Sequence, residues 1–340
     1  MKHGQRIRPV GGARRAERWF RTHTFDAVPP SATGEVAERK RRQGARISVV
    51  IPTLNEAPTI GSIVHTIRTE LMDHHALVDQ LVVIDGGSTD GTQAQARHMG
   101  ADVFDVHDVV PEISPVGGKG DSMWRSVRVA TGDIVVWIDA DIRNFGPRFI
   151  TGLVAPMLDD ADLAFVKGFY RRPIAFGSVV HPAGGGRVTE LLARPLINAF
   201  FPELAGFLQP LAGEYAVRRD VAMRLPYFTG YSVEAGLLID LLADVGLERM
   251  AQADLGERLH RNRRLEELAP MAGSIARAIL LRAEEQGRAR GMLDIIGAPM
   301  LARSGYDTLA TVPIAELERP PLTLLDVSAR LSEAIPSRAD

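Results

Sequence analysis

The sequence predicts an α/β protein built on a Rossmann-like, doubly wound and mostly parallel β-sheet. Apolar runs of strand length, rich in Val and Ile, occupy residues 47–51, 81–84 and 134–138. Such runs are typical of strands that are buried on both faces of a parallel sheet. Helical patterns follow or separate these runs, so the alternation favours βαβ units. The predicted helices in this half are 59–71, 92–99 and 121–130.

The second half continues the alternation with shorter and less regular elements. The strands predicted in this half are 163–169, 215–217 and 255–260, and the helices are 235–244 and 265–289. One further short strand, 101–104, is predicted in the first half. With 340 residues, 45% of them hydrophobic, the chain can bury one large core. We therefore expect a basic N-terminal arm, a catalytic domain in two halves, and a Pro-rich tail or dimer arm. Their boundaries are 1–46, 47–290 (divided into 47–145 and 146–290) and 291–340.

Composition excludes several classes of site. The chain has no cysteine, which excludes disulfides, Cys-ligated zinc and thiol catalysis. A net charge of −2 gives no global attraction to nucleic acid or to a membrane, and no apolar run approaches the ~20 residues of a membrane span. We expect a soluble cytoplasmic protein that binds neither nucleic acid nor membrane.

Residues 1–46 are strongly basic, with twelve Lys and Arg against four Asp and Glu. Such an arm could grip nucleic acid or an anionic lipid surface. The favoured interpretation is a partly disordered arm that packs Trp19 and Phe20 on the body or on a partner subunit, because few aromatic residues are available to stack on bases.

Two carboxylates, Asp139 and Asp141, flank Ala140 directly after the strand at 134–138. Open α/β sheets bind ligands at the carboxyl ends of their strands. Neighbouring carboxylates repel each other unless a cation or hydrogen-bond donors neutralise them, and hard oxygen ligands favour Mg²⁺ or Mn²⁺. An isolated Asp-x-Asp is also a common turn or helix cap, so the rest of the chain has to decide between the two.

Two glycine-rich turns precede predicted helices and are suited to anions. Gly117-Gly118-Lys119-Gly120 could place a phosphate on free backbone N–H groups, with Lys119 as a point charge, although it is not a Walker A loop. Gly184-Gly185-Gly186 is followed by Arg187 and Thr189, which are suited to a phosphate or a carboxylate. The alternatives are a simple glycine turn and a flexible hinge.

Glu234 and His260 have ordinary interpretations when they are considered alone. Glu234 lies near the first turn of a predicted helix, where an acidic residue complements the helix dipole. His260 follows a predicted strand and could ligate a metal, but a single His is more often a surface or hydrogen-bonding residue.

Taken together, these stretches resemble the actinobacterial glucosyl-3-phosphoglycerate synthases, which are retaining glycosyltransferases of the GT-A fold. The similarity covers about residues 47–270. Its narrowest motifs are Gly184-Gly185-Gly186-Arg187-Val188-Thr189-Glu190-Leu191 and His260-Arg261-Asn262-Arg263. The other matching stretches are Ile51-Pro52-Thr53-Leu54-Asn55-Glu56, Gly86-Gly87-Ser88-Thr89-Asp90, Gly118-Lys119-Gly120, Asp139-Ala140-Asp141, Phe169-Tyr170-Arg171-Arg172-Pro173 and Gln209-Pro210-Leu211. The first of these and Asp139-Ala140-Asp141 would alone support only a generic glycosyltransferase.

The resemblance implies a role for each matching residue. Asp141, Lys119, Arg187 and Glu234 would be catalytic, and Asp141 and His260 would hold Mg²⁺ or Mn²⁺. The nucleotide sugar would contact Pro52, Thr53, Leu54, Glu56, Gly86, Lys119, Asp139, Ala140, Asp141, Leu211, Tyr231 and Glu234. The acceptor would contact Gly186, Arg187, Thr189 and Asn262. A homodimer is also implied.

The implied reaction is transfer of glucose, with UDP-glucose favoured as donor, to the 2-hydroxyl of 3-phosphoglycerate with retention of configuration. The alternative enzyme is a mannosyl-3-phosphoglycerate synthase that uses GDP-mannose. An alternative of another class is an inactive GT-A module that only binds a nucleotide sugar. Gly86 and Ala140 replace serines of the family pattern, and the change at Gly86 leaves the choice of nucleotide open.

Overall fold

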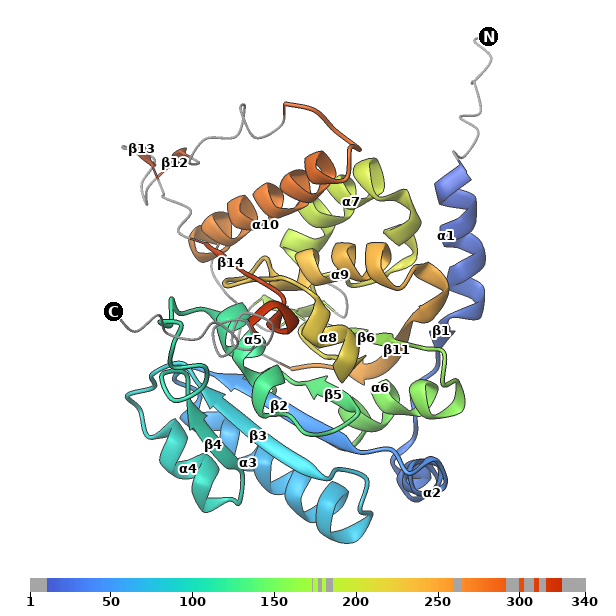
Figure 1. The fold of residues 1–340 in the computed structure, drawn as a ribbon, viewed down its shortest axis with the longest axis vertical. Coiled ribbons are helices and arrows are strands. Elements are labelled where there is room, and N and C mark those ends of the chain that lie inside the picture. Colours follow the sequence, from blue (N-terminus) through green and yellow to red (C-terminus); the bar gives the residue numbers. More distant parts are fainter. Residues whose placement is uncertain are drawn as a thin grey trace, which may run out of the picture.

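The chain folds around an eight-stranded mixed sheet that carries helices on both faces (Figure 1). The structure is a computed structural model, and it describes residues 11–172, 174–176, 179–181, 186–259, 265–291, 300–302, 309–311 and 316–325. None of the described helices combines the length and the apolarity needed to cross a membrane.

The strand order of the sheet is β1-β11-β6-β9-β5-β2-β3-β4. Only β9 runs antiparallel to its neighbours, β5 and β6, and every other pair is parallel. The strands are β1 (Thr24–Phe25), β2 (Ile47–Thr53), β3 (Gln80–Asp85), β4 (Asp102–Asp105), β5 (Ile134–Trp137), β6 (Phe165–Arg171), β9 (Tyr215–Arg218) and β11 (Met250–Glu257). Short pairs in the described residues join β7 (Ile174–Phe176) to β8 (Val179–His181), β10 (Tyr227–Phe228) to β14 (Glu318–Arg319), and β12 (Met300–Ala302) to β13 (Leu309–Thr311).

Two hydrophobic cores lie on opposite faces of the sheet because successive strand residues point to opposite sides. The helices are α1 (Gly11–Thr22), α2 (Thr33–Gln43), α3 (Ala57–Thr66), α4 (Thr92–His98), α5 (Lys119–Val129), α6 (Arg148–Asp159), α7 (Arg194–Phe200), α8 (Arg219–Arg224), α9 (Val233–Asp244) and α10 (Leu265–Glu285). On β2, Val50 joins the core under α5, α7, α9 and α10, whereas Val49 and Ile51 join the core under α2, α3 and α6.

The α/β class and the mostly parallel sheet are confirmed, but one strand was placed wrongly. β11 begins at Met250, not at residue 255, and it ends before Arg258. Its polar residues obscured the pattern, since Gln252 is buried and bonds to Thr24 Oγ1, Gly206 O and Leu208 N. Four helices, α1, α2, α6 and α8, have no counterpart among the predicted ones.

The described part of the basic N-terminal region packs on the sheet. Trp19 of α1 is buried, and its Nε1 donates to Met250 O at 2.8 Å. Phe20 remains 37% exposed, so only one of the two aromatic residues packs as expected. After α1, β1 extends the main sheet by pairing with β11.

The C-terminal segment 316–325 returns to the body beside α5 and α9. β14 pairs with β10, and Trp124 Nε1 donates to Pro320 O at 2.8 Å. Arg319 is buried beside Asp121, with Nε 2.7 Å from Oδ1, and it also donates to Ser114 O. This segment therefore closes the core next to the first turn of α5.

We predict that Arg319→Met lowers the free energy of unfolding by about 3 kcal/mol, because Asp121 would stay buried with one cation fewer. The matched control is Arg224→Met, whose exposed pairs with Asp220 and Asp244 should contribute less than about 1 kcal/mol. Urea unfolding of both variants measures the difference. Equal losses would contradict this account of the C-terminal segment.

Candidate active site

A cavity of about 400 Å³ opens at the carboxyl ends of β2, β3 and β5. It is the place where parallel sheets bind ligands, because the loops after these strands meet there. The cavity is lined by fifteen residues that the sequence singled out: Pro52, Thr53, Leu54, Glu56, Gly86, Lys119, Asp139, Ala140, Asp141, Gly186, Arg187, Thr189, Leu211, Tyr231 and Glu234. The remaining two, His260 and Asn262, lie outside the described residues.

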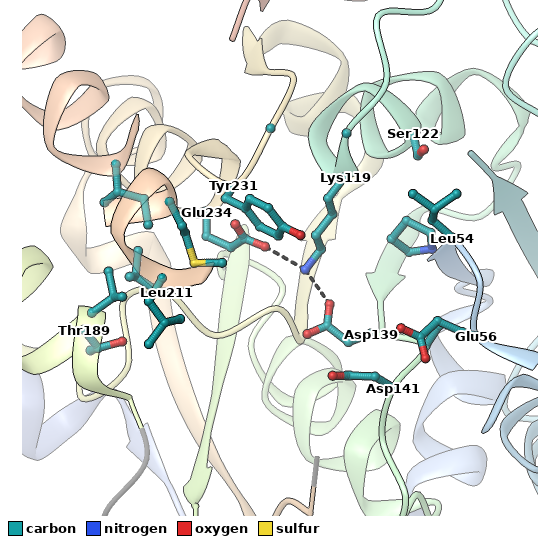
Figure 2. Close-up of a pocket in the computed structure, with 18 of the residues that line it drawn as sticks. Leu54, Glu56, Lys119, Ser122, Asp139, Asp141, Thr189, Leu211, Tyr231 and Glu234 are labelled. Carbon is teal, nitrogen blue, oxygen red and sulfur yellow. Dashed lines mark hydrogen bonds and ion pairs between the residues drawn. The ribbon is translucent and has the colours of Figure 1, made fainter. Parts of the chain in front are cut away.

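One end of the cavity is formed by the loop after β2. Asn55 has a positive φ of 57°, and its backbone N–H donates to Ser88 Oγ at 2.8 Å. The N–H of Glu56 donates to Thr92 Oγ1 at 2.9 Å. The turn after β3, which includes Ser88, is stabilised by the buried Asp85, whose carboxylate accepts a hydrogen bond from Ser88 N. The two loops therefore hold each other, and Leu54 and Glu56 lie at this end in Figure 2.

Lys119 stands at the centre of the cavity because α5 begins there. Gly118 has a φ of 94°, and a Cβ on Gly120 would lie 1.8 Å from Phe228 O, so the turn requires glycine at both positions. Lys119 Nζ contacts Asp139 and lies 2.7 Å from Glu234 Oε1 (Figure 2). Burial lowers the pKa of Lys119, but the two carboxylates outweigh it and raise that pKa above its usual range. The ammonium is therefore charged.

The two aspartates after β5 differ in their partners. Asp139 uses both oxygens, accepting from Lys119 at Oδ1 and from Arg258 Nη2 at Oδ2, 2.9 Å away. Burial alone would raise the pKa of Asp139, but Lys119 and Arg258 lower it by a larger amount. The pKa therefore lies below its usual range, and the carboxylate is ionised. Asp141 also accepts from Arg258 at Oδ1, yet its side chain is 32% exposed to the cavity. No described residue donates to its other oxygen.

Arg258 is the residue that the sequence reasoning missed. Its side chain is 4% exposed and contacts three carboxylates, those of Asp139, Asp141 and Glu214. Arg258 lies between a buried strand and the His260 motif, and this position could have indicated a site residue. The strand predicted at 255–260 instead placed Arg258 within a strand. Arg258 is thus the main counter-ion of the carboxylate cluster among the described residues.

A second buried group supports Arg258 from behind. Tyr170 OH accepts from Arg258 Nη1 at 2.6 Å and from Arg172 Nη2 at 2.8 Å, and it donates to Glu214 Oε2 at 2.7 Å. Burial raises the pKa of Tyr170 to about 12, so the phenol keeps the proton that it donates.

Lys167 is also buried near this cluster. Its Nζ donates to Ala212 O at 2.9 Å, and burial lowers the pKa of Lys167 to about 7.

The opposite end of the cavity is formed by Gly186, Arg187 and Thr189, where the chain enters a helical turn before α7. Gly186 has a φ of 83°, and its carbonyl accepts from Glu190 N. Leu268, Met271 and Ile275 of α10 also line the cavity. In Figure 2, Thr189 and Leu211 lie at this end, with Lys119 and Asp139 between them and Leu54.

Comparison with known proteins gives consistent matches. The family model "Glycosyl transferase family 2" matches residues 48–200. The glucosyl-3-phosphoglycerate synthase of Petrotoga mobilis is 41% identical over 85% of this chain and 89% of that protein. The enzyme of the same name from Mycolicibacterium smegmatis is 42% identical over 91% and 98%.

Solved structures match over similar lengths. Mannosyl-3-phosphoglycerate synthase from Rubrobacter xylanophilus is 40% identical with a TM-score of 0.83, covering 91% of this chain and 98% of that one. Glucosyl-3-phosphoglycerate synthase from Mycobacterium tuberculosis, in complex with Mn²⁺, UDP-glucose and phosphoglyceric acid, is 41% identical with a TM-score of 0.76, covering 89% and 98%. The GT-A fold predicted from the sequence is confirmed. The chain belongs to the glucosyl-3-phosphoglycerate synthase family of hexosyltransferases.

Proposed function

We propose that this chain transfers glucose from UDP-glucose to the 2-hydroxyl of 3-phospho-D-glycerate with retention of configuration. The observation that carries the proposal is the lining of one cavity by the residues that the family pattern assigns to donor and acceptor. The M. tuberculosis relative has been crystallised with UDP-glucose and phosphoglyceric acid together, which supports the same substrate pair here.

The donor would lie across the half of the cavity that includes the loop after β2. Pro52, Thr53, Leu54, Glu56 and Gly86 would contact the nucleoside, and Lys119 would reach the diphosphate. Tyr231 and Glu234 would face the sugar hydroxyls, with Leu211 beside them. Gly186, Arg187 and Thr189, together with Asn262 outside the described residues, would bind the acceptor at the other end.

The donor set of this structure fits a hard divalent cation at Asp141. Its side chain offers a carboxylate oxygen to the cavity, whereas both oxygens of Asp139 already accept from Lys119 and Arg258. We therefore propose Asp141 as a ligand of Mg²⁺ or Mn²⁺ and Asp139 as a support, with His260 as the second protein ligand outside the described residues. When bound, the cation would supply Lewis-acid stabilisation of diphosphate charge. M. tuberculosis relatives have been solved with Mn²⁺ and with Mg²⁺.

The chemistry would proceed without an enzyme nucleophile. Glu234 and Asp139 are both paired with Lys119, and we propose that they hold this ammonium in place rather than attack the sugar. The acceptor 2-hydroxyl would attack from the face that the diphosphate leaves, and the departing phosphate oxygen would take its proton. Lys119 would stabilise the charge that develops on the diphosphate, and Arg187 would position the acceptor.

The second candidate is transfer of mannose from GDP-mannose to the same acceptor. It is supported by the R. xylanophilus mannosyl-3-phosphoglycerate synthase, whose TM-score of 0.83 exceeds the 0.76 of the glucosyl enzyme complex. The alternative of an inactive binding module finds no support, because Lys119, Asp139, Asp141 and Arg187 are all present in the cavity. A homodimer remains part of the proposal, and sedimentation equilibrium would test it.

The deciding experiment incubates the purified protein with 3-phosphoglycerate, Mg²⁺ and one of three donors: UDP-glucose, GDP-glucose or GDP-mannose. Product identity and anomeric configuration are read by NMR. We expect α-linked glucosyl-3-phosphoglycerate, formed fastest from UDP-glucose. Turnover with GDP-mannose alone would replace the glucosyl proposal by the mannosyl one.

We predict that Asp141→Asn weakens Mn²⁺ binding in the presence of UDP and lowers kcat at least about a hundredfold, since the cation loses an anionic ligand. Electron paramagnetic resonance of free Mn²⁺ measures the affinity without relying on turnover. Asp102→Asn, on the exposed edge of β4, is the control and should change neither value. Unaltered Mn²⁺ affinity in Asp141→Asn would refute the assignment of the ligand.

We predict that Arg187→Ala raises the KM for 3-phosphoglycerate about tenfold or more and leaves the dissociation constant of the donor unchanged, because the lost charge-assisted hydrogen bonds are to the acceptor. Initial-rate kinetics and donor calorimetry separate the two effects. Arg18→Ala on the exposed side of α1 serves as control. A fall in donor affinity instead would place Arg187 in the other half of the site.

A further inference from the structure

We infer that Arg172 is a further acceptor-binding residue, whose guanidinium takes one anionic group of 3-phosphoglycerate. The inference rests on the proposed acceptor and extends it to a side chain that the family pattern did not assign. Arg172 follows β6 and lines the same cavity as Gly186, Arg187 and Thr189.

The charges around the cavity distinguish Arg172 from two other cations that line it. Lys119 contacts the carboxylates of Asp139 and Glu234. Arg258 contacts those of Asp139, Asp141 and Glu214. Within the described parts of the chain, no carboxylate lies within ion-pair distance of Arg172. Among these three cations, Arg172 is therefore the one whose guanidinium makes no direct ion pair with a described carboxylate, which leaves its N–H groups available to an anionic ligand.

The hydrogen bonds of Arg172 are also incomplete. Nη2 donates to Tyr170 OH at 2.8 Å, but Nε is buried and has no hydrogen-bond partner. A buried donor without an acceptor costs folding free energy and is rare in native structures. An oxyanion that enters the cavity beside Arg172 would supply the missing acceptor.

The position of the guanidinium is fixed before any ligand binds. It lies 4.8 Å over the ring of Tyr170, and the hydroxyl of that ring is shared with Arg258. Tyr170 is buried, and its OH donates a hydrogen bond to Glu214 Oε2 at 2.7 Å. The residues that hold the Arg172 guanidinium in place are therefore part of the core. Binding therefore requires little ordering of the side chain, which favours affinity.

The ligand chemistry matches such a cation. 3-Phosphoglycerate carries a carboxylate and a phosphate, and the phosphate alone has about −1.5 to −2 charges near pH 7. A planar guanidinium binds either oxyanion through two parallel N–H donors. Because Arg172 and Arg258 share Tyr170 OH, the acceptor anion would be held next to the group that fixes Asp139 and Asp141. Arg172 would thus help to position the 2-hydroxyl for attack.

The test compares Arg172→Gln and Arg172→Lys with Arg171→Gln, the exposed neighbour at the end of β6. Calorimetry measures the dissociation constants of 3-phosphoglycerate and of UDP, and initial rates give KM and kcat. We expect Arg172→Gln to weaken 3-phosphoglycerate binding about tenfold or more, with UDP binding unchanged. Arg172→Lys should restore part of the loss, and Arg171→Gln should behave as the wild type.

Acceptor fragments then identify the group that Arg172 binds. Glycerol 3-phosphate lacks the carboxylate, and D-glycerate lacks the phosphate, while both keep the 2-hydroxyl. If the penalty of Arg172→Gln persists with glycerol 3-phosphate, the phosphate is the ligand; if it persists only with D-glycerate, the carboxylate is. Either pattern supports the inference.

Unchanged 3-phosphoglycerate affinity in Arg172→Gln would overturn the inference while leaving the proposed reaction intact. Equal weakening of 3-phosphoglycerate and UDP would also overturn it, because that result indicates a merely structural role through Tyr170. A wild-type protein that neither binds nor glycosylates 3-phosphoglycerate would overturn the inference and the proposed function together.

Discussion

One guanidinium, that of Arg258, holds the carboxylates at the base of the active-site cavity together. Asp139, Asp141 and Glu214 all contact it, and Glu214 is completely buried. Buried carboxylates so close together would repel one another and lose their hydration without a cation. The end of β5, the approach to β9 and the segment after β11 therefore depend on the same side chain, and so does the shape of the cavity.

The contacts with Arg258 leave Asp139 and Asp141 with different hydrogen-bond partners. Asp139 is saturated by Lys119 and Arg258 and acts as part of the framework, whereas Asp141 keeps an oxygen toward the cavity. The ammonium group of Lys119 contacts both Asp139 and Glu234. It therefore helps to position the first turn of α5 relative to the first turn of α9. Behind them, Tyr170 OH accepts hydrogen bonds from both Arg258 and Arg172, and Arg172 lines the cavity where we propose that the acceptor binds. The proposed donor and acceptor halves of the cavity thus share one polar network.

Much of the fold and of the cavity lining could be predicted from the sequence, because both follow from local patterns. Buried parallel strands are apolar and short, and Asp139, Lys119 and Arg187 stand next to strand ends or glycine turns that mark them. Glu214 and Tyr170 could not be found in this way, and the place of Arg258 after a strand did not indicate its carboxylate partners, since these contacts join β6, β9 and the end of β11. The same reason applies to β1 and β14, whose partners are distant in the chain.

The division of roles between Asp139 and Asp141 is tested most directly by a crystal structure of the protein with UDP and Mn²⁺. The arrangement described above predicts an Mn²⁺ ion bound by Asp141, with Asp139 still accepting from Lys119 and Arg258. An ion that bridges both aspartates, with Lys119 displaced from Asp139, would contradict it.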